Sequence, residues 1–364
     1  MPPMQLNWDI FCRVVDNYGD IGVCWRLARQ LANEHGKQVR LWVDDLTSLK
    51  PLCSMININL KQQYYQGVEV LHWAEFHAID RVADVVVEAF ACELPSAYLL
   101  AMASSTTKPC WINLEYLTAE RWAEACHGMA SPHPALPLTK YFFFPGFSDS
   151  TGGLLRESHL IFEDNGKQSV TSPQNDALQI SLFCYDTAPV GKLLNALSET
   201  LIPVVLHVAP GKPLAAVSAH LGNNGPWQLG LLKVIPFDFL PQDDYDNLLQ
   251  RCDINFVRGE DSFVRAQWAG KPFVWQIYPQ DEDTHLIKLD AFLARFTEGW
   301  LSDTANATVD FIKAWNSDGN LSHVWTQYLH EISTIHRCTL QWREKLANSP
   351  DLTNQLVKFC AHRV

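Results

Sequence analysis

The chain has 364 residues, of which 47% are apolar and 19% charged, and its formal net charge is −12. This length exceeds what one hydrophobic core supports, so we expect about two domains, each with an apolar interior. The acidic balance argues against a general nucleic-acid binder, which needs basic residues to neutralise phosphates, and favours a basic protein surface as a partner.

In the first half of the chain, apolar runs alternate with helical patterns. Strands are expected at residues 8–15, 38–43, 68–71, 83–90 and 109–114, and helices in the stretch that ends at Gly36 and at residues 95–102 and 119–126. The run 83–90 is nearly all apolar, as a parallel strand covered on both faces should be. The alternation predicts a doubly wound parallel sheet.

A segment rich in Ser, Gly, Asp, Asn and Gln, residues 148–176, has the composition of a linker. The alternation then resumes, with strands expected at residues 178–184, 202–208, 227–236, 254–257 and 272–277 and helices at 190–197, 214–221, 243–251 and 263–269. The tail carries helical stripes at 286–296 and 321–332, and Ser349 and Pro350 are a good N-cap and first-turn pair for a last helix.

Two features of the sequence indicate the cellular compartment of the protein: its cysteine usage and the absence of long apolar runs. The ten cysteines are scattered, without a Cys-x-x-Cys pair, and most lie within apolar runs. This pattern indicates reduced, buried thiols in a cytoplasmic protein. The chain starts without a charged segment followed by an apolar one, and no apolar stretch reaches the roughly 20 residues that span a bilayer. We therefore expect a cytoplasmic protein with no membrane partner.

The stretch Asp16-Asn17-Tyr18-Gly19-Asp20 lies between the first strand and the first helix. Such strand–glycine–helix corners commonly bind phosphate through their amides and the helix N-terminus. Two carboxylates in this loop would repel a phosphate, so the corner suits a cationic or proton-losing partner. For Asp16, the alternative is a turn residue that bonds its own backbone.

A second candidate site follows the strand at 254–257, where Arg258-Gly259-Glu260-Asp261-Ser262 precedes a predicted helix. Free amides at a helix start, a glycine that permits close approach and a guanidinium that grips oxygens bidentately all favour a diphosphate. Glu260 could hold sugar hydroxyls. The structural alternative is that Asp261 or Ser262 is an ordinary N-cap and that the acidic residues complement the helix dipole.

Aromatic residues stand at other strand ends of the second half. Phe183 and Tyr185 close the strand at 178–184, and Phe239 and Gln242 follow the strand at 227–236. Rings at these places could stack on a base whose edge Gln242 would read by hydrogen bonds, although one or two of them could simply belong to the core.

Other motifs are missing from the sequence. It has no P-loop, no Gly-x-Gly-x-x-Gly, no Gly-x-Ser-x-Gly and no His-Glu-x-x-His, which disfavours kinase-like ATP use, dinucleotide binding, a serine hydrolase and a zincin. A metal site is not indicated. The residues alone leave open a sugar-nucleotide transferase, an epimerase or hydrolase, and a non-catalytic nucleotide-sugar binding protein.

Four motifs resemble those of the bacterial protein-arginine rhamnosyltransferases that modify elongation factor P. They are Asp16 to Gly22, Asn113 to Leu117, Phe143 to Phe147 and Arg258 to Ser262. The resemblance covers most of the chain. It implies an inverting, metal-independent enzyme without cofactors that moves L-rhamnose from dTDP-β-L-rhamnose to an arginine of elongation factor P and so activates the factor in translation elongation.

The resemblance also implies a fold and a domain assignment. The expected fold class is α/β, a GT-B fold with two Rossmann-like domains facing each other across a cleft, where ligands bind beyond the carboxyl ends of the strands. Residues 1–176 would form the acceptor side, with the helix 349–364 crossing back to it, and residues 177–348 would bind the donor.

Particular residue roles follow from the same resemblance. On the acceptor side we expect Asp20 to take the proton and Asp16 to orient the arginine or to tune Asp20 through like-charge proximity. Asn17, Tyr18, Gly19, Glu115 and Tyr116 are expected on the same side. On the donor side we expect Phe183, Tyr185, Phe239 and Gln242 around thymine, and Arg258, Gly259, Glu260, Asp261 and Ser262 around the diphosphate and sugar, with Glu260 also a catalytic candidate.

Overall fold

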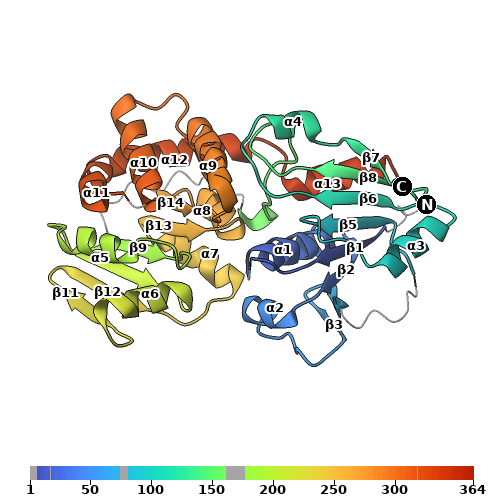
Figure 1. The fold of residues 1–364 in the computed structure, drawn as a ribbon, viewed down its shortest axis with the longest axis horizontal. Helices are drawn as coiled ribbons and strands as arrows, with labels where there is room; N and C mark the ends of the chain where they lie inside the picture. The colour runs from blue at the N-terminus through green and yellow to red at the C-terminus, as the bar shows by residue number, and fades with distance from the viewer. Residues whose placement is uncertain (1–5, 17, 74–80, 161–176, 318) are drawn as a thin grey trace. The chain divides into compact units, whose positions relative to one another are not determined.

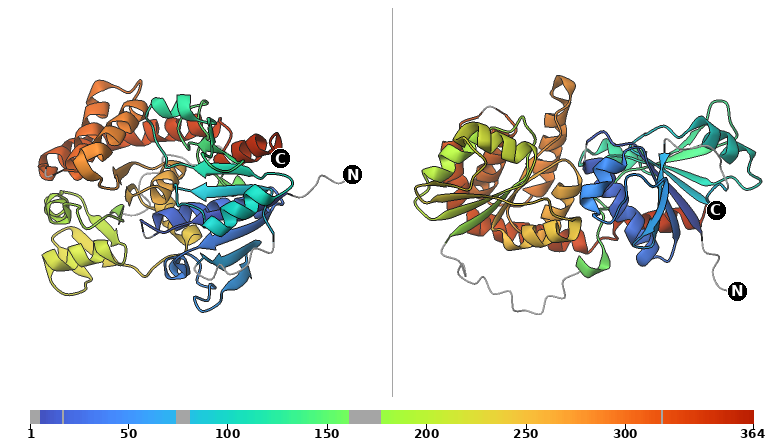
Figure 2. Two further views of the ribbon diagram at one scale, coloured as in Figure 1. Left: turned by 45° about the vertical axis from the view of Figure 1, so that its right-hand side comes forward. Right: turned by 90° about the horizontal axis from the view of Figure 1, so that it is seen from below.

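The computed structural model describes residues 6–16, 18–73, 81–160, 177–317 and 319–364. The chain folds as two compact units. Unit 1 comprises Met1–Ile161 and Ala347–Val364, and unit 2 comprises Phe162–Leu346. Each unit is a sheet with helices packed against it (Figures 1 and 2). The domain boundary expected at residue 176 lies outside the described residues.

Unit 1 is built on a sheet of eight strands in the order β3-β4-β2-β1-β5-β6-β8-β7, parallel except for the edge strands β3 and β7. Its elements are β1 (Asn7–Cys12), α1 (Gly19–Asn33), β2 (Gln38–Val43), α2 (Leu46–Leu52), β3 (Gln62–Tyr65), β4 (Val68–His72), β5 (Val85–Ala89), α3 (Ser96–Ser104), β6 (Cys110–Leu114), α4 (Trp122–Cys126), β7 (Ala130–Pro132), β8 (Thr139–Phe143) and α13 (Leu352–Ala361). The sequence patterns missed β3, β7 and β8, which are short or only half-buried.

Alternate side chains of the central strands of unit 1 belong to two hydrophobic cores, one on each face of the sheet. One core joins Ile10 of β1 to Leu27 of α1 and Leu356 of α13. The other core joins Phe11, the next residue of β1, to Tyr98 of α3. Burial on both faces explains why these strands are nearly continuous apolar runs in the sequence.

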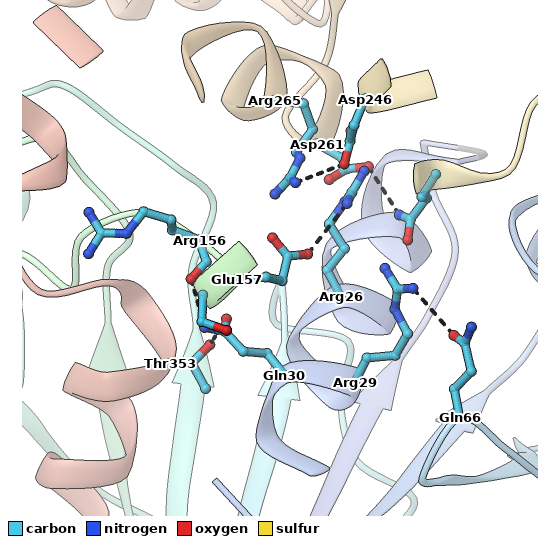
Figure 3. A network of polar contacts seen from close by, with 12 residues as sticks. Arg26, Arg29, Gln30, Gln66, Arg156, Glu157, Asp246, Asp261, Arg265 and Thr353 are labelled. Carbon is cyan, nitrogen blue, oxygen red and sulfur yellow. Dashed lines mark hydrogen bonds and ion pairs between the residues drawn. The ribbon is translucent and has the colours of Figure 1, made fainter. Parts of the chain in front are cut away.

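Polar contacts attach the last helix to the first one within unit 1 (Figure 3). Thr353 of α13 donates its hydroxyl to the Gln30 side-chain oxygen at 2.6 Å. The Gln30 amide in turn donates to the Arg156 carbonyl at 2.8 Å and to Asp351 at 3.3 Å. Because Gln30 is only 2% exposed, these bonds satisfy a buried amide and help to place α13 beside α1.

The start of α13 differs from the prediction. Its N-cap is Asp351, whose carboxylate accepts the Asn354 amide at 3.0 Å, so Ser349 and Pro350 precede the helix. The predicted linker 148–176 is also partly wrong. Leu154 and Leu155 within it are buried in unit 1, and residues 161–176 lie outside the described residues.

The backbone at Gly153 lies close to the backbone at Pro350. Its φ is +75°, and a Cβ at this position would lie 2.6 Å from the Pro350 carbonyl oxygen. We expect Gly153→Ala to lower the free energy of unfolding by about 2 kcal/mol or more, because it adds a backbone clash to left-handed strain. Thermal denaturation measures this effect. The matched control is Gly36→Ala, since Gly36 has φ +60° but no atom within 4 Å of an added Cβ; equal losses for both variants would contradict the clash.

Unit 2 contains a six-stranded sheet in the order β11-β12-β10-β9-β13-β14. Its elements are β9 (Leu178–Leu182), α5 (Val190–Ser198), β10 (Val204–Val208), α6 (Lys212–Leu221), β11 (Trp227–Leu229), β12 (Leu232–Pro236), α7 (Gln242–Arg251), β13 (Ile254–Arg258), α8 (Asp261–Ala269), β14 (Phe273–Gln276), α9 (Thr284–Phe296), α10 (Ser302–Trp315), α11 (Leu321–His330) and α12 (Ile332–Ala347). All described strand pairs are parallel except β11 with β12.

Two predictions for unit 2 are wrong in detail. The single strand expected at 227–236 is the hairpin of β11 and β12, which turns at Gly230 with φ +59°. The stripe at 321–332 is split, because α11 ends at His330 and α12 begins at Ile332. Helices α10 and α12 were not predicted. None of the helices in the described part of the chain combines the length and apolarity that a bilayer crossing requires.

Aromatic packing and buried polar pairs hold the helices of unit 2 to its sheet. Phe256 of β13 packs edge-on against Trp315 of α10, with ring centroids 4.8 Å apart. Arg265 of α8 forms a buried ion pair of 2.8 Å with Asp246 of α7 (Figure 3). The ion pair joins α7 to α8, the helices that precede and follow β13 in the chain.

Candidate active site

Asp20 is a buried carboxylate at the start of α1. Its side chain is 2% exposed, and Oδ2 accepts the backbone amides of Val15 at 2.8 Å and of Asp16 at 2.9 Å. The loop that leaves β1 is therefore closed around this carboxylate. A charged group held this firmly by backbone donors keeps one geometry.

Residues from two parts of unit 1 determine the charge state of Asp20. Burial raises its pKa above the ordinary aspartate value, and the nearby Asp16 carboxylate raises it further. The two loop amides lower the pKa, as does the Tyr116 hydroxyl, which donates to Asp20 Oδ1 at 3.2 Å. The net result is a raised pKa, so the ionised Asp20 carboxylate is a stronger proton acceptor than an ordinary aspartate.

We expect Tyr116→Phe to shift to higher pH the acid limb of any activity that needs an ionised Asp20, such as the transfer expected from the sequence. The variant removes a hydrogen bond that favours the ionised form of Asp20, so the pKa of Asp20 rises and the base stays protonated to higher pH. The measurement is kcat/KM for transfer as a function of pH. Tyr64→Phe, at a tyrosine that is 73% exposed, is the control; an unshifted limb in Tyr116→Phe would remove the hydroxyl from this role.

Two other predicted residues of the acidic loop, Tyr18 and Gly19, directly precede Asp20 in the chain. The Gly19 amide donates to the Asp16 carbonyl at 2.6 Å. A Cβ on Gly19 would lie 2.7 Å from Asp16 Oδ2, so the glycine leaves room for that carboxylate. Tyr18 is the N-cap residue of α1 and makes no side-chain cap, and Asn17 lies outside the described residues.

Glu115 follows β6, one residue before Tyr116. Its carboxylate accepts the side-chain amide of Asn113, and its own backbone amide donates to the Phe143 carbonyl at 2.9 Å. The structure thus ties two motifs of the sequence, 113–117 and 143–147, to each other at the carboxyl ends of β6 and β8. This is the edge of the sheet at which ligands of doubly wound folds bind.

In unit 2, the guanidinium of Arg258 lies against two aromatic rings. Its Cζ is 4.5 Å from the centroid of Phe183 and 4.4 Å from that of Tyr185. Arg258 is 6% exposed, so it is a buried cation supported by π-systems. Phe183 and Tyr185, which were expected to stack on a base, hold the guanidinium in this structure.

The turn after Arg258 is fixed by Ser262. The Ser262 hydroxyl donates to the Arg258 carbonyl at 2.6 Å and accepts the Arg258 amide at 3.0 Å. Gly259 has φ +59° and donates its amide to Gln276 at 3.2 Å. The N-cap of α8 is Glu260, without a side-chain cap, so the alternative that made Asp261 or Ser262 an N-cap is wrong.

The remaining predicted donor residues lie at the start of α7. Gln242 is 4% exposed, and its amide donates to Asp261 at 3.1 Å, which brings the two motifs of unit 2 together. Phe239 is 37% exposed in the loop before α7. Contacts thus join Phe183, Tyr185 and Gln242 to the turn from Arg258 to Ser262 at the strand ends.

Sequence reasoning missed three residues of this cluster. Tyr245 packs its ring 5.8 Å from Phe183, and its buried hydroxyl has no hydrogen-bond partner among the described residues. Gln276 accepts the Tyr185 amide at 2.7 Å, and Tyr278 packs its ring 5.4 Å from Tyr185. Gln276 and Tyr278 stand at the carboxyl end of β14, and that position is the signal that could have found them.

No group of three or more His, Cys, Asp or Glu side chains arranged to hold a metal ion is found within the described ranges. All ten cysteines are free thiols; eight are buried, and Cys126 and Cys338 are half-buried.

The two Rossmann-like units are those of the GT-B fold. A solved structure of MurG from Acinetobacter baumannii is similar over 98% of this chain and 99% of that chain, with a TM-score of 0.53 and 14% identity. The glycotransferase of kitacinnamycin matches with a TM-score of 0.53 and 13% identity over 98% of this chain and 100% of that chain. At these identities the likeness shows the fold alone.

Closer relatives narrow the class. A structure that describes EarP-mediated arginine glycosylation of translation elongation factor EF-P matches 99% of this chain and 100% of that chain, with 34% identity and a TM-score of 0.67. The model of the Elongation-Factor P (EF-P) rhamnosyltransferase EarP family matches residues 8–361. The chain therefore belongs to this rhamnosyltransferase family, and it is an enzyme of the glycosyltransferase class.

Curated relatives agree with the family model. A protein-arginine rhamnosyltransferase from Pseudomonas putida is 46% identical over 98% of this chain and 99% of its own length. One from Pseudomonas aeruginosa is 44% identical over the same shares of the two chains. The family predicted from the four motifs is thus confirmed.

Proposed function

We propose that the chain transfers L-rhamnose from dTDP-β-L-rhamnose to an arginine side chain of elongation factor P, with inversion at the anomeric carbon, and so activates the factor in translation elongation. The observation that carries this proposal is Asp20, a buried carboxylate of raised pKa in an acidic loop at the start of a helix. The reaction takes place in the cytoplasm, where the translation factor works.

Asp20 acts as the general base. A guanidinium is a poor nucleophile because its positive charge is delocalised and its pKa is above about 12. As a guanidino nitrogen forms its bond to the anomeric carbon, the bond from that carbon to the diphosphate oxygen breaks, and the nitrogen loses a proton to the Asp20 carboxylate. Asp16 pairs with the remaining N–H groups and orients the acceptor, because a carboxylate and a guanidinium match bidentately.

In this proposal the acceptor is bordered by Asn17, Tyr18, Gly19, Glu115 and Tyr116. The Tyr116 hydroxyl has a specific role, because it donates a hydrogen bond of 3.2 Å to Asp20 Oδ1. Glu115 adds a further carboxylate at the same sheet edge. An acidic, partly exposed border of this kind matches the positive charge of an arginine on a protein loop.

The donor binds in unit 2. Arg258 and the amides at the start of α8 stabilise the negative charge that develops on the leaving diphosphate, so the step needs no metal ion and no other cofactor. Gln242 and Phe239 contact the thymine, and Phe183 and Tyr185 border it while they support Arg258. The sugar and phosphates are contacted by Glu260, Asp261 and Ser262. These residues follow the turn at Gly259, whose positive φ lets the backbone approach the ligand closely.

The test is incubation of the purified chain with elongation factor P and dTDP-β-L-rhamnose in the presence of a chelator, followed by intact mass spectrometry of the factor. We expect the mass of one deoxyhexose on the factor and none on a factor whose acceptor arginine is replaced by lysine. NMR of the product is expected to show an α-linked rhamnose. An unmodified factor, or a β-linked product, would contradict the proposal.

Incubation with the donor alone distinguishes a sugar-nucleotide epimerase or hydrolase from the proposed transferase. Such an enzyme consumes the nucleotide sugar without any acceptor, whereas the proposed transferase leaves it nearly unchanged. Chromatography of the nucleotide after incubation with and without the factor separates the two activities. A dTDP release rate that does not depend on the factor would favour the hydrolase.

A further inference from the structure

Tyr116, which donates to Asp20, packs against the ring of Phe90. The two ring centroids are 4.4 Å apart and the rings are nearly parallel, at 17°. Tyr116 is 40% exposed, whereas Phe90 is half-buried and packs against the hydrophobic core of unit 1. The core is therefore continued, through Phe90, to the tyrosine that contacts the candidate base.

The backbone at Phe90 adopts an unusual conformation to make this contact. Phe90 has φ +56° and Ala91 has φ +52°, a region that residues other than glycine rarely occupy. The Phe90 amide donates to the Leu114 carbonyl at 2.7 Å, and Leu114 is the last residue of β6. The end of β5 is thus bound to the end of β6 two residues before Tyr116.

We propose that Phe90 is a positioning residue for the transfer reaction, because its ring holds Tyr116 where the tyrosine hydroxyl donates to Asp20. The proposal rests on the function proposed for Asp20. In this proposal Phe90 acts through Tyr116 and not by its own contact with the reacting atoms. It lies in none of the four motifs that mark the family, so sequence patterns do not single it out.

The groups that act on the Asp20 carboxylate come from several elements. Asp16 and the amides of the acidic loop face it from its own segment, Tyr116 faces it from the end of β6, and the Cys12 thiol at the end of β1 lies within its field. Of these groups, Tyr116 packs against a ring from another strand end, that of Phe90. Loss of the Phe90 ring is therefore expected to act on Asp20 through Tyr116.

The test is a double-mutant cycle of Phe90→Leu and Tyr116→Phe, read as kcat/KM for transfer against pH. Phe90→Leu keeps an apolar side chain but removes the flat ring face. We expect it to lower kcat/KM by up to about ten-fold, which corresponds to the strength of an aromatic pair, and to move the acid limb to higher pH. Phe90→Tyr keeps the ring and is expected to recover most of the activity and the original limb.

The double variant decides between positioning and simple structural damage. If Phe90 acts through the Tyr116 hydroxyl, Phe90→Leu causes little further loss and no further pH shift once Tyr116→Phe is present. Additive losses, or an acid limb that Phe90→Leu leaves in place, would overturn the proposal. Melting temperatures of all variants identify any that fail to fold. If Phe90→Leu melts at a lower temperature than the wild type, the recovery of activity and of the acid limb in Phe90→Tyr still tests the role of the ring.

The Asp20→Asn variant separates this inference from the proposed function. Retained transfer in Asp20→Asn would contradict the base assignment itself. An inactive Asp20→Asn together with a wild-type pH profile in Phe90→Leu would contradict only the role of Phe90.

Discussion

Asp20→Asn is expected to lower the rate of rhamnose transfer by about 100-fold or more, the usual contribution of a general base, and to leave the dissociation constant for the donor unchanged. The variant keeps the size of the side chain and one oxygen that can accept from the Val15 and Asp16 amides. It removes the carboxylate that takes the proton in the proposed mechanism. Single-turnover transfer and calorimetry of donor binding measure the two quantities separately.

Asp44→Asn is the matched control for this variant. Asp44 also accepts a backbone amide near the end of β1, from Val14 at 2.9 Å, but it lies outside the acidic loop. It should retain transfer. Transfer at the wild-type rate in Asp20→Asn, or an equal loss in Asp44→Asn, would contradict a specific role for Asp20.

Stability provides a second control. The pKa of Asp20 is raised in the folded state, so its ionisation costs stability as pH rises above the ordinary aspartate value. A neutral asparagine avoids this cost. We therefore expect Asp20→Asn to melt at the same temperature as the wild type or higher at neutral pH, which separates its loss of activity from misfolding.

Arg258→Ala is expected to weaken donor binding by about 100-fold, because it removes the buried cation that pairs with phosphate oxygens in the proposed donor site. Arg258→Lys restores the charge but not the planar group that packs on Phe183 and Tyr185. Its affinity for the donor should therefore lie between that of the wild type and that of Arg258→Ala. Calorimetry with dTDP and with dTDP-β-L-rhamnose measures both variants.

Arg251→Ala is the control for the loss of one positive charge in unit 2. Arg251 is an exposed residue in the last turn of α7, and its Nε donates to the Asn247 carbonyl at 3.3 Å. Donor affinity should be unaffected by this change. If Arg258→Ala binds the donor as the wild type does, Arg258 does not belong to the donor site.

Sequence patterns predicted the alternation of strands and helices well because buried parallel strands are continuous apolar runs. They also located both candidate sites, because chemically unusual loops stood at expected strand ends: Asp16 to Asp20 after β1 and Arg258 to Ser262 after β13. The family, the fold class and the enzyme class predicted from those loops agree with the comparisons.

Contacts between distant residues could not be predicted in this way. Tyr116 and Asp20 are 96 residues apart in the chain, and no periodicity predicts that the tyrosine hydroxyl would meet that carboxylate. The position of Arg258 between two rings depends on the pairing of β9 with β13. The hairpin at 227–236 was missed because its turn contains a single glycine and its strands are short.

The most direct test of the account is the pH dependence of single-turnover transfer with saturating donor, compared between the wild type and Asp20→Asn. We expect the wild type to lose activity on its acid side at a pH above the ordinary aspartate range, because burial and Asp16 raise the pKa of Asp20. The residual activity of Asp20→Asn should lack this limb. An acid limb that persists unchanged in Asp20→Asn would show that another group takes the proton.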